Sequence, residues 1–266
     1  MKKLSVLAIA FVAIAFAACG GKKTQATEQA QEEKSFEQTQ IEASIKMHLD
    51  SISAQLSELP QLPFLTEGEG GLTLTKEEKQ VKPDYLLSAT VADEATTLAE
   101  KYRILSALNI DKKIAAIYEM PVEDYDKAIA KLAADVNDPA FKDIDDASTI
   151  FETTQALYKN MEQNGRINYF WQLAAAAVVE QLYIANQNSE KFLSVFDDKA
   201  ADNVTFRIVV ILDAINRLAQ YDPEVKPVAD ALAPLSVLNA TSVDELKTQL
   251  EAAKDKIAAA RAALID

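Results

Sequence analysis

The chain has 266 residues, with 41 acidic and 27 basic side chains, and carries a formal net charge of −14 at pH 7. Such a charge disfavours nucleic acid and anionic lipid surfaces as partners, because their phosphates would repel the protein. The single cysteine and the single histidine exclude a disulfide framework and a histidine-rich zinc or iron site. We therefore expect no cofactor.

Glycine usage indicates the fold class. The chain has six glycines, and only Gly165 lies beyond Gly71. Tight β-turns and phosphate-binding loops need glycine, whereas helical bundles need little of it. We predict a single all-α domain over residues 36–266, an irregular bundle of about seven to nine helices.

The N-terminus has the pattern of a secretory leader. Two lysines precede an apolar run over residues 4–18, which ends at Cys19. A run of about 15 residues matches the apolar part of a signal peptide and falls short of the ~20 residues of a membrane span. We expect residues 1–18 to be removed as a signal peptide.

The stretch Phe16-Ala17-Ala18-Cys19, followed by Gly20, resembles the lipobox of a bacterial lipoprotein precursor. The resemblance covers residues 1–20 and implies cleavage before Cys19, a diacylglycerol on its sulfur and usually an acyl chain on its amine. Phe16 departs from the leucine that is commoner at that place. By analogy with the family, Gly20 favours the outer membrane, facing the periplasm, with the cell surface or the inner membrane as alternatives. An ordinary signal peptide with a stray cysteine is the other interpretation.

Residues 19–35 carry no aliphatic side chain larger than alanine and predict a disordered tether behind the lipidated cysteine. About 16 such residues have a root-mean-square reach on the order of 20–25 Å. Loss of residues 1–18 removes two lysines and no acid, which takes the net charge from −14 to −16.

The first predicted helix starts near Ile41 and ends before Pro60, with an apolar stripe spaced by three and four residues. Residues 60–83 then form a long loop rich in proline and glycine. Loops of this length in compact domains are often functional or mobile. The alternation of Leu and Thr over 72–75 is compatible with a short extended piece.

Further helices follow in chain order. We expect them over residues 84–108, after Asp111, from Pro121 to about 136, from 146 or 148 to 161, over 167–186, near 189–197, over 203–221, and from the capping box at Ser242 to about 264. The helix over 167–186 is apolar nearly all round, which is typical of a buried central helix.

Two charged side chains interrupt apolar helices. Glu180 lies within "AAAAVVEQLYIA" and Arg207 within "NVTFRIVVIL". If these helices pack antiparallel, the two residues are roughly level, and we predict a buried ion pair or one shared polar network, because an unpaired buried charge is costly. The alternative is that Arg207 extends to water from the first turn of its helix.

Other candidates are weaker. Tyr169 and Trp171 are possible ligand-contact aromatics, although consecutive helical residues point in different directions and core packing is the simpler interpretation. His48 lies at the edge of the first apolar stripe and predicts a solvated or boundary residue. Asp50-Ser51-Ile52 resembles a short O-glycosylation signal of some bacterial envelope proteins, with Ser51 as the acceptor.

No catalytic constellation emerges from the sequence. We therefore expect a membrane-anchored, non-enzymatic binding or scaffold module of the cell envelope, held by lipid on Cys19, with envelope proteins as partners. The alternatives are a small-molecule or glycan binder with a pocket between helices, and an enzyme with dispersed carboxylates. A pocket containing Glu180 and lined by Trp171 or Tyr169 would favour the binder. Two buried carboxylates facing each other across a cleft would favour the enzyme.

Overall fold

The computed structural model describes residues 36–66, 68, 70–141 and 154–265, with the side chains from residue 42 onward. The predicted signal peptide, Cys19 and the tether lie outside the described residues. The described part contains α-helices and short 3₁₀ turns and no strand, which confirms the all-α class. The helices are α1 (Phe36–Ser57), α2 (Lys76–Gln80), α3 (Leu98–Ile117), α4 (Glu123–Val136), α5 (Thr154–Gln163), α6 (Ile167–Gln187), α7 (Ser189–Phe192), α8 (Asp198–Leu218), α9 (Lys226–Leu232), α10 (Val243–Ala252) and α11 (Lys254–Leu264).

The number of helices exceeds the predicted seven to nine because the sequence does not predict α2 and α9 and because the last predicted helix is divided into α10 and α11. Of the eleven helices in the described part, α2, α7 and α9 have seven residues or fewer. Helix α7 lies within the short helix expected near 189–197. None of the described helices is both long and apolar enough to cross a bilayer.

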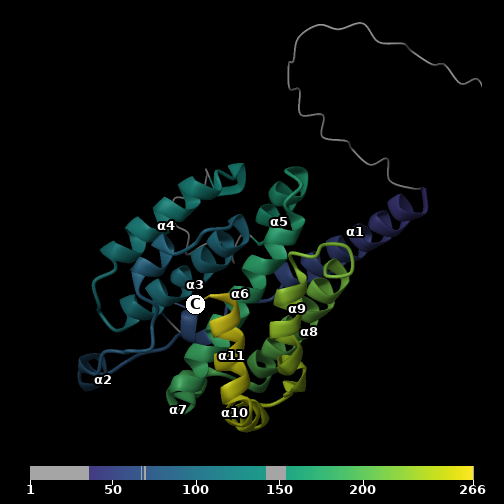
Figure 1. The fold of residues 1–266 in the computed structure, drawn as a ribbon. Coiled ribbons are helices and arrows are strands. Elements are labelled where there is room, and N and C mark those ends of the chain that lie inside the picture. The colour runs from purple at the N-terminus through teal and green to yellow at the C-terminus, as the bar shows by residue number, and fades with distance from the viewer. Residues whose placement is uncertain (1–35, 67, 69, 142–153, 266) are drawn as a thin grey trace, which may run out of the picture.

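Helix α6 is the central element of the bundle, as its composition predicts. Sixteen of its 21 residues are buried. Figure 1 shows α6 and α3 near the middle of the molecule, with α4 on one side and α8 and α9 on the other. Helix α6 packs against α3, α5, α8 and α11. Because it has neighbours all round, a polar side chain at almost any position of α6 enters the core.

The start of α3 differs from the prediction. The expected helix over 84–108 begins only at Leu98 and then continues through Asp111 to Ile117, while 84–97 holds a single 3₁₀ turn, η2 (Ala89–Asp93). A capping box fixes the boundary: the Thr97 hydroxyl accepts from the Glu100 N–H, and the Glu100 carboxylate accepts from the Thr97 N–H at 2.8 Å. The sequence contains this Thr-x-x-Glu capping signal. The cap determines where α3 begins, although the apolar spacing continues on both sides of it.

Replacing Thr97 by alanine is expected to lower the free energy of unfolding by about 1 kcal/mol, because the first turn of α3 loses its cap. The hydrogen bonds from Thr97 and Thr96 lower the pKa of Glu100 to about 2. The stability that Glu100 contributes is therefore complete above its unfolded pKa, near 4.5, and is lost as the pH falls towards 2. Urea unfolding of Thr97→Ala and wild type at pH 7 measures the loss of the cap. Glu100→Gln against wild type at pH 7 and pH 3 measures the contribution of the carboxylate, which keeps its bonds to the Thr96 and Thr97 N–H groups in Thr97→Ala; a Glu100→Gln difference that does not shrink at pH 3 would contradict this role for Glu100.

Part of the long loop over 60–83 packs against the helices, while other positions, such as Val81, are exposed. It contains η1 (Pro63–Leu65) and α2, and its apolar side chains join the core: Leu62, Phe64, Leu65, Leu72 and Leu74. The Phe64 ring packs against Phe192 and Phe196 at centroid distances of 5.4 and 6.0 Å. Residues 72–75 alternate buried and exposed, but they run without a strand partner among the described residues.

One glycine of this loop is required by its surroundings. A Cβ atom at Gly71 would lie 2.0 Å from the Thr66 carbonyl oxygen, so any side chain there would push the backbone apart. The tight approach of residues 66 and 71 closes a turn that brings Leu65 and Leu72 into the core together.

The last predicted helix is divided into two. Ser242 caps α10 as expected, accepting from the Glu245 N–H, and the predicted stripe is buried from Leu246 to Leu264. The helix breaks at Ala253, and α11 then packs along α6. This packing places Arg261 against the central helix.

Candidate binding site

Helix α6 presents two adjacent polar residues to two different parts of the core. Glu180 and Gln181 are separated by about 100° around the helix axis. Glu180 is 0 % exposed and faces α11, while Gln181 is 6 % exposed and lies with Arg207 of α8. The candidate site residues therefore divide into a sealed carboxylate cluster and a cavity next to Arg207.

The partner of Glu180 is Arg261. The Arg261 Nε donates to Glu180 Oε2 at 2.7 Å and Nη2 donates to Oε1 at 3.0 Å, which is a two-pronged ion pair. The guanidinium also lies 4.2 Å from the centroid of the Tyr183 ring. The two side chains are 9 % and 0 % exposed, so the pair lies within the core.

A second buried carboxylate belongs to the same cluster. Asp111 of α3 is 0 % exposed, and its Oδ2 accepts from the Leu87 N–H at 2.7 Å. Burial, together with the charge of Glu180 and hydrogen bonding to it, raises the pKa of Asp111 well above its ordinary value, against the opposing effect of Arg261. The raised pKa favours a protonated Asp111, and with that proton the cluster of two acids and one guanidinium is electrically neutral.

The predicted ion pair between Glu180 and Arg207 is wrong, although both residues are buried as expected. Arg207 is 8 % exposed and donates from Nη2 to the Pro60 carbonyl. Burial alone lowers its pKa, to about 10. The helices are level as predicted, since Arg207 lines a cavity with Val178 and Gln181. The error is in the direction: Val178 and Glu180 are about 200° apart on α6, so Glu180 points away from α8.

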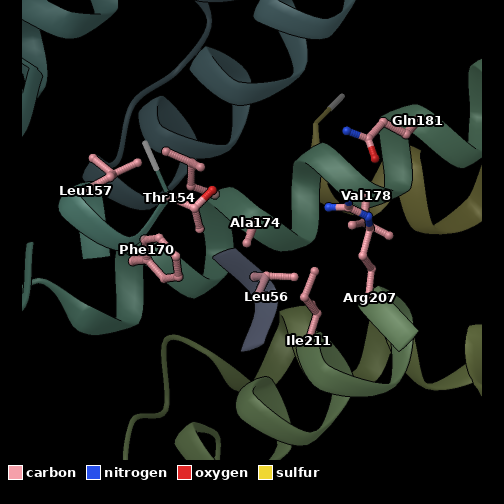
Figure 2. Close-up of a pocket in the computed structure, with 10 residues that line it drawn as sticks. Leu56, Thr154, Leu157, Phe170, Ala174, Val178, Gln181, Arg207 and Ile211 are labelled. Carbon is pink, nitrogen blue, oxygen red and sulfur yellow. The ribbon is translucent and has the colours of Figure 1, made fainter. Parts of the chain in front are cut away.

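A small cavity lies beside Arg207 between α1, α5, α6 and α8. It has a volume of about 20 Å³, and Figure 2 shows Arg207 reaching from α8 towards Val178 and Gln181 of α6. Leu56, Leu157, Phe170 and Ile211 form most of the apolar wall. A second cavity of about 10 Å³ shares Arg207, Gln181 and Val178.

The two candidate aromatics are packed against other rings. Trp171 is 0 % exposed and meets Phe170 edge-to-face at 5.2 Å. Tyr169 stacks on Tyr102 at 5.2 Å. Neither residue lines the two cavities near Arg207, so core packing accounts for both positions.

His48 is a boundary residue, as predicted. It bonds the Asp213 carboxylate across α1 and α8, and Arg217 bonds the same carboxylate at 3.0 Å. Hydrogen bonds from Arg217 and His48 outweigh partial burial and lower the pKa of Asp213. Ser51 lies on the exposed side of α1. The described residues contain no cluster of three or more histidine, cysteine or acidic side chains able to hold a metal ion.

A surface groove lies between η2 and α4. It has a volume of about 420 Å³ and contains Tyr125, whose hydroxyl donates to the Leu87 carbonyl at 2.8 Å. On the groove wall, Lys127 pairs with Asp124 and Lys131 with Asp93. The groove therefore offers an apolar floor with neutralised charges at its edge.

Sequence reasoning missed Asp111, Arg261 and Gln181. Asp111 interrupts the apolar run "ILSALNIDKKIAAI", the same signal that identified Glu180, but it was taken for a helix start. Arg261 is the single charge in "IAAARAALI". The short side chains of that alanine-rich helix let Arg261 lie close to α6.

Comparison with known proteins identifies no relative of this chain. No protein-family model matches the chain, and no curated protein and no solved structure is significantly similar to it.

Proposed function

We propose that the protein is a lipoprotein of the bacterial cell envelope, anchored through Cys19 to the outer membrane and facing the periplasm. The observation that carries this proposal is the stretch Phe16-Ala17-Ala18-Cys19-Gly20 behind a 15-residue apolar run, residues 4–18. Two or three acyl chains hold a protein firmly on a bilayer, at about 0.8 kcal/mol per buried methylene. The cell surface and the inner membrane are the alternative locations.

Cys19→Ser is expected to abolish both acylation and membrane retention in a bacterial host. Metabolic labelling with an alkyne-bearing fatty acid and partition into a detergent phase measure the two effects. Ser51→Ala, which changes one hydroxyl on exposed α1, is the matched control and keeps both. An unmodified Cys19 in the mass spectrum of the wild-type product, or a wild-type protein released by gentle lysis without detergent, would contradict the anchor.

We further propose that the helical domain binds or scaffolds envelope partners and is not an enzyme. Its two buried carboxylates, Asp111 and Glu180, are each 0 % exposed. Two such acids within one cluster would suit acid–base chemistry only if a substrate reached them. Here Arg261 binds both Glu180 oxygens and the Leu87 N–H binds one oxygen of Asp111. This arrangement supports a structural role for the cluster and leaves the surface for partners.

A small-molecule or glycan binder is the second candidate function, favoured by the groove between η2 and α4. Its volume of about 420 Å³ lies within the 300–1,000 Å³ typical of ligand pockets. Calorimetric titration with soluble envelope glycans distinguishes the two functions. Saturable heat supports the binder, while enrichment of one envelope protein on cross-linking in intact cells supports the scaffold.

A further inference from the structure

Asn164-Gly165 is the one Asn-Gly pair in the sequence, although the chain contains ten asparagines. In such a pair the backbone nitrogen of the second residue can attack the side-chain carbonyl carbon of the asparagine. Glycine has no Cβ atom to obstruct this approach, and it leaves the backbone free to rotate. Among the asparagines of this chain, Asn164 is therefore the one whose sequence context most favours loss of the amide.

The pair lies at the turn between α5 and α6, and both of its residues are exposed to solvent. Gly165 has a φ of 67°, the left-handed conformation in which helices commonly end. Its N–H donates to the Glu162 carbonyl at 3.0 Å, and the Arg166 N–H donates to the Met161 carbonyl at 2.7 Å. These two hydrogen bonds form a Schellman motif, which closes the C-terminus of α5.

The Schellman motif protects the pair while it is closed. The attacking atom is the Gly165 nitrogen, which is held in the hydrogen bond to Glu162. That bond must break, and the backbone of Asn164 must turn, before the nitrogen reaches the side-chain carbonyl carbon. Exposed helix ends open locally with a much smaller free energy than the whole protein needs to unfold. The reaction is therefore slowed in the folded protein but not prevented.

We propose that Asn164 is a site of spontaneous deamidation, which proceeds through a cyclic imide formed by the Gly165 nitrogen. This nitrogen bonds to the Asn164 Cγ, its proton passes through solvent to Nδ2, and the Cγ–Nδ2 bond breaks with release of ammonia. Water then opens the imide at one of its two carbonyl carbons. Opening at Cγ gives aspartate, and opening at the backbone carbonyl carbon gives isoaspartate, in which the chain continues through the side chain.

Both products disturb the junction that Arg166 forms between α6 and the end of α4. The Arg166 guanidinium donates to the Val136 carbonyl at 2.9 Å and lies 3.3 Å from the buried Asp138 carboxylate. Aspartate places a negative charge at the C-terminal end of α5, where the helix dipole disfavours it. Isoaspartate adds a methylene to the backbone just before Gly165, which changes the spacing that the Schellman motif requires. The modification therefore weakens this junction, whether or not the lipid anchor and the groove beside α4 have their proposed roles.

Incubation of the full chain in a non-ionic detergent at pH 6 and pH 9, followed by peptide mapping with mass spectrometry, tests the proposal. We expect a mixture of aspartate and isoaspartate at position 164, formed faster at pH 9 because base removes the proton from the attacking nitrogen. Conversion should be about tenfold faster in urea above the unfolding midpoint, where the hydrogen bond to Glu162 is lost. Exposed Asn188, which precedes Ser189, is the internal control and should keep its amide over the same period.

An intact Asn164 in the folded protein, at a time when the same pair has fully converted in urea, would overturn the proposal. So would aspartate as the only product, because direct hydrolysis of the amide gives no isoaspartate. Equal conversion of Asn164 and Asn188 would overturn it as well, because the Gly165 nitrogen would then have no special part in the reaction.

Asn164→Asp reproduces one of the two products and measures its effect on the junction. The added charge at the end of α5 is expected to lower the thermal midpoint by roughly 1–3 °C. Asn188→Asp is the matched control, because Asn188 caps the N-terminus of α7, where aspartate is an equally good cap and its charge suits the helix dipole. Its midpoint should not fall. An Asn164→Asp midpoint equal to that of the wild type would contradict the proposed weakening of the junction.

Discussion

Arg261→Met is expected to lower the free energy of unfolding by about 3–5 kcal/mol, the cost of leaving one member of a buried ion pair without its partner. Arg261 donates twice to Glu180, which is 0 % exposed and has no route to solvent. Urea denaturation at pH 7, followed by the fluorescence of buried Trp171, measures the loss.

The double variant Glu180→Gln/Arg261→Met separates the pair from the packing around it. Removal of both charges leaves a neutral cluster, and replacement of a buried ion pair by neutral groups of similar volume is often neutral or stabilising. The double variant should therefore recover at least half of the loss. Arg217→Met, whose ion pair with Asp213 is about 40 % exposed, is the matched control and should cost less than about 1 kcal/mol. A double variant less stable than Arg261→Met would show that the ion pair is not the source of the loss.

The central helix illustrates what the sequence can predict and what it cannot. The apolar run "FWQLAAAAVVEQLYIA" predicts a helix buried on all sides, and α6 fulfils this prediction. Burial on all sides also means that the sequence does not show which neighbouring helix a given side chain of α6 faces, because every direction around the helix leads into the core. Glu180 and Arg261 are 81 residues apart, and no local periodicity connects them. Burial was therefore predictable, whereas the identity of the partner was not.

The ends of helices can likewise be predicted only where a local sequence signal marks them. Helix α4 was predicted because Tyr125, Ile129, Leu132 and Val136 form one clean buried stripe. Helix α3 was predicted wrongly at its start because apolar residues continue through 84–97, where they pack in loop and 3₁₀ geometry. There the decisive signal is a cap, Thr97 with Glu100, which depends on two side chains and not on a periodic pattern.

Asp111→Asn is expected to become progressively more stable than the wild type as the pH rises above about 4, the region of the unfolded pKa. Burial and the charge of Glu180 raise the folded-state pKa of Asp111 well above its ordinary value of 3.8. The folded state therefore binds the proton more tightly than the unfolded chain. The stability that protonated Asp111 contributes is complete below the unfolded pKa and is lost as the pH rises towards the folded pKa, at up to about 1.4 kcal/mol per pH unit.

Asparagine mimics the protonated acid at every pH. Its carbonyl oxygen accepts from the Leu87 N–H, and its amide can donate towards Glu180, so the variant should lose this decline while keeping the local hydrogen bonds. Tyr125, which borders the cluster, does not interfere in the range from pH 4 to 9, because burial raises its pKa to about 12. Urea unfolding across that range should give two curves that diverge as the pH rises, with Asp111→Asn the more stable.

The matched control is Asp124→Asn, an acid whose side chain is 84 % exposed on α4, and its curve should run parallel to that of the wild type. A parallel curve for Asp111→Asn would mean that Asp111 is ionised in the folded protein. The cluster would then carry a net negative charge inside the core, with Arg261 balancing only one of its two acids. An excess buried charge of that kind would need a second cation or a ligand to balance it. The two carboxylates would then be candidates for acid–base chemistry, which a neutral cluster does not support.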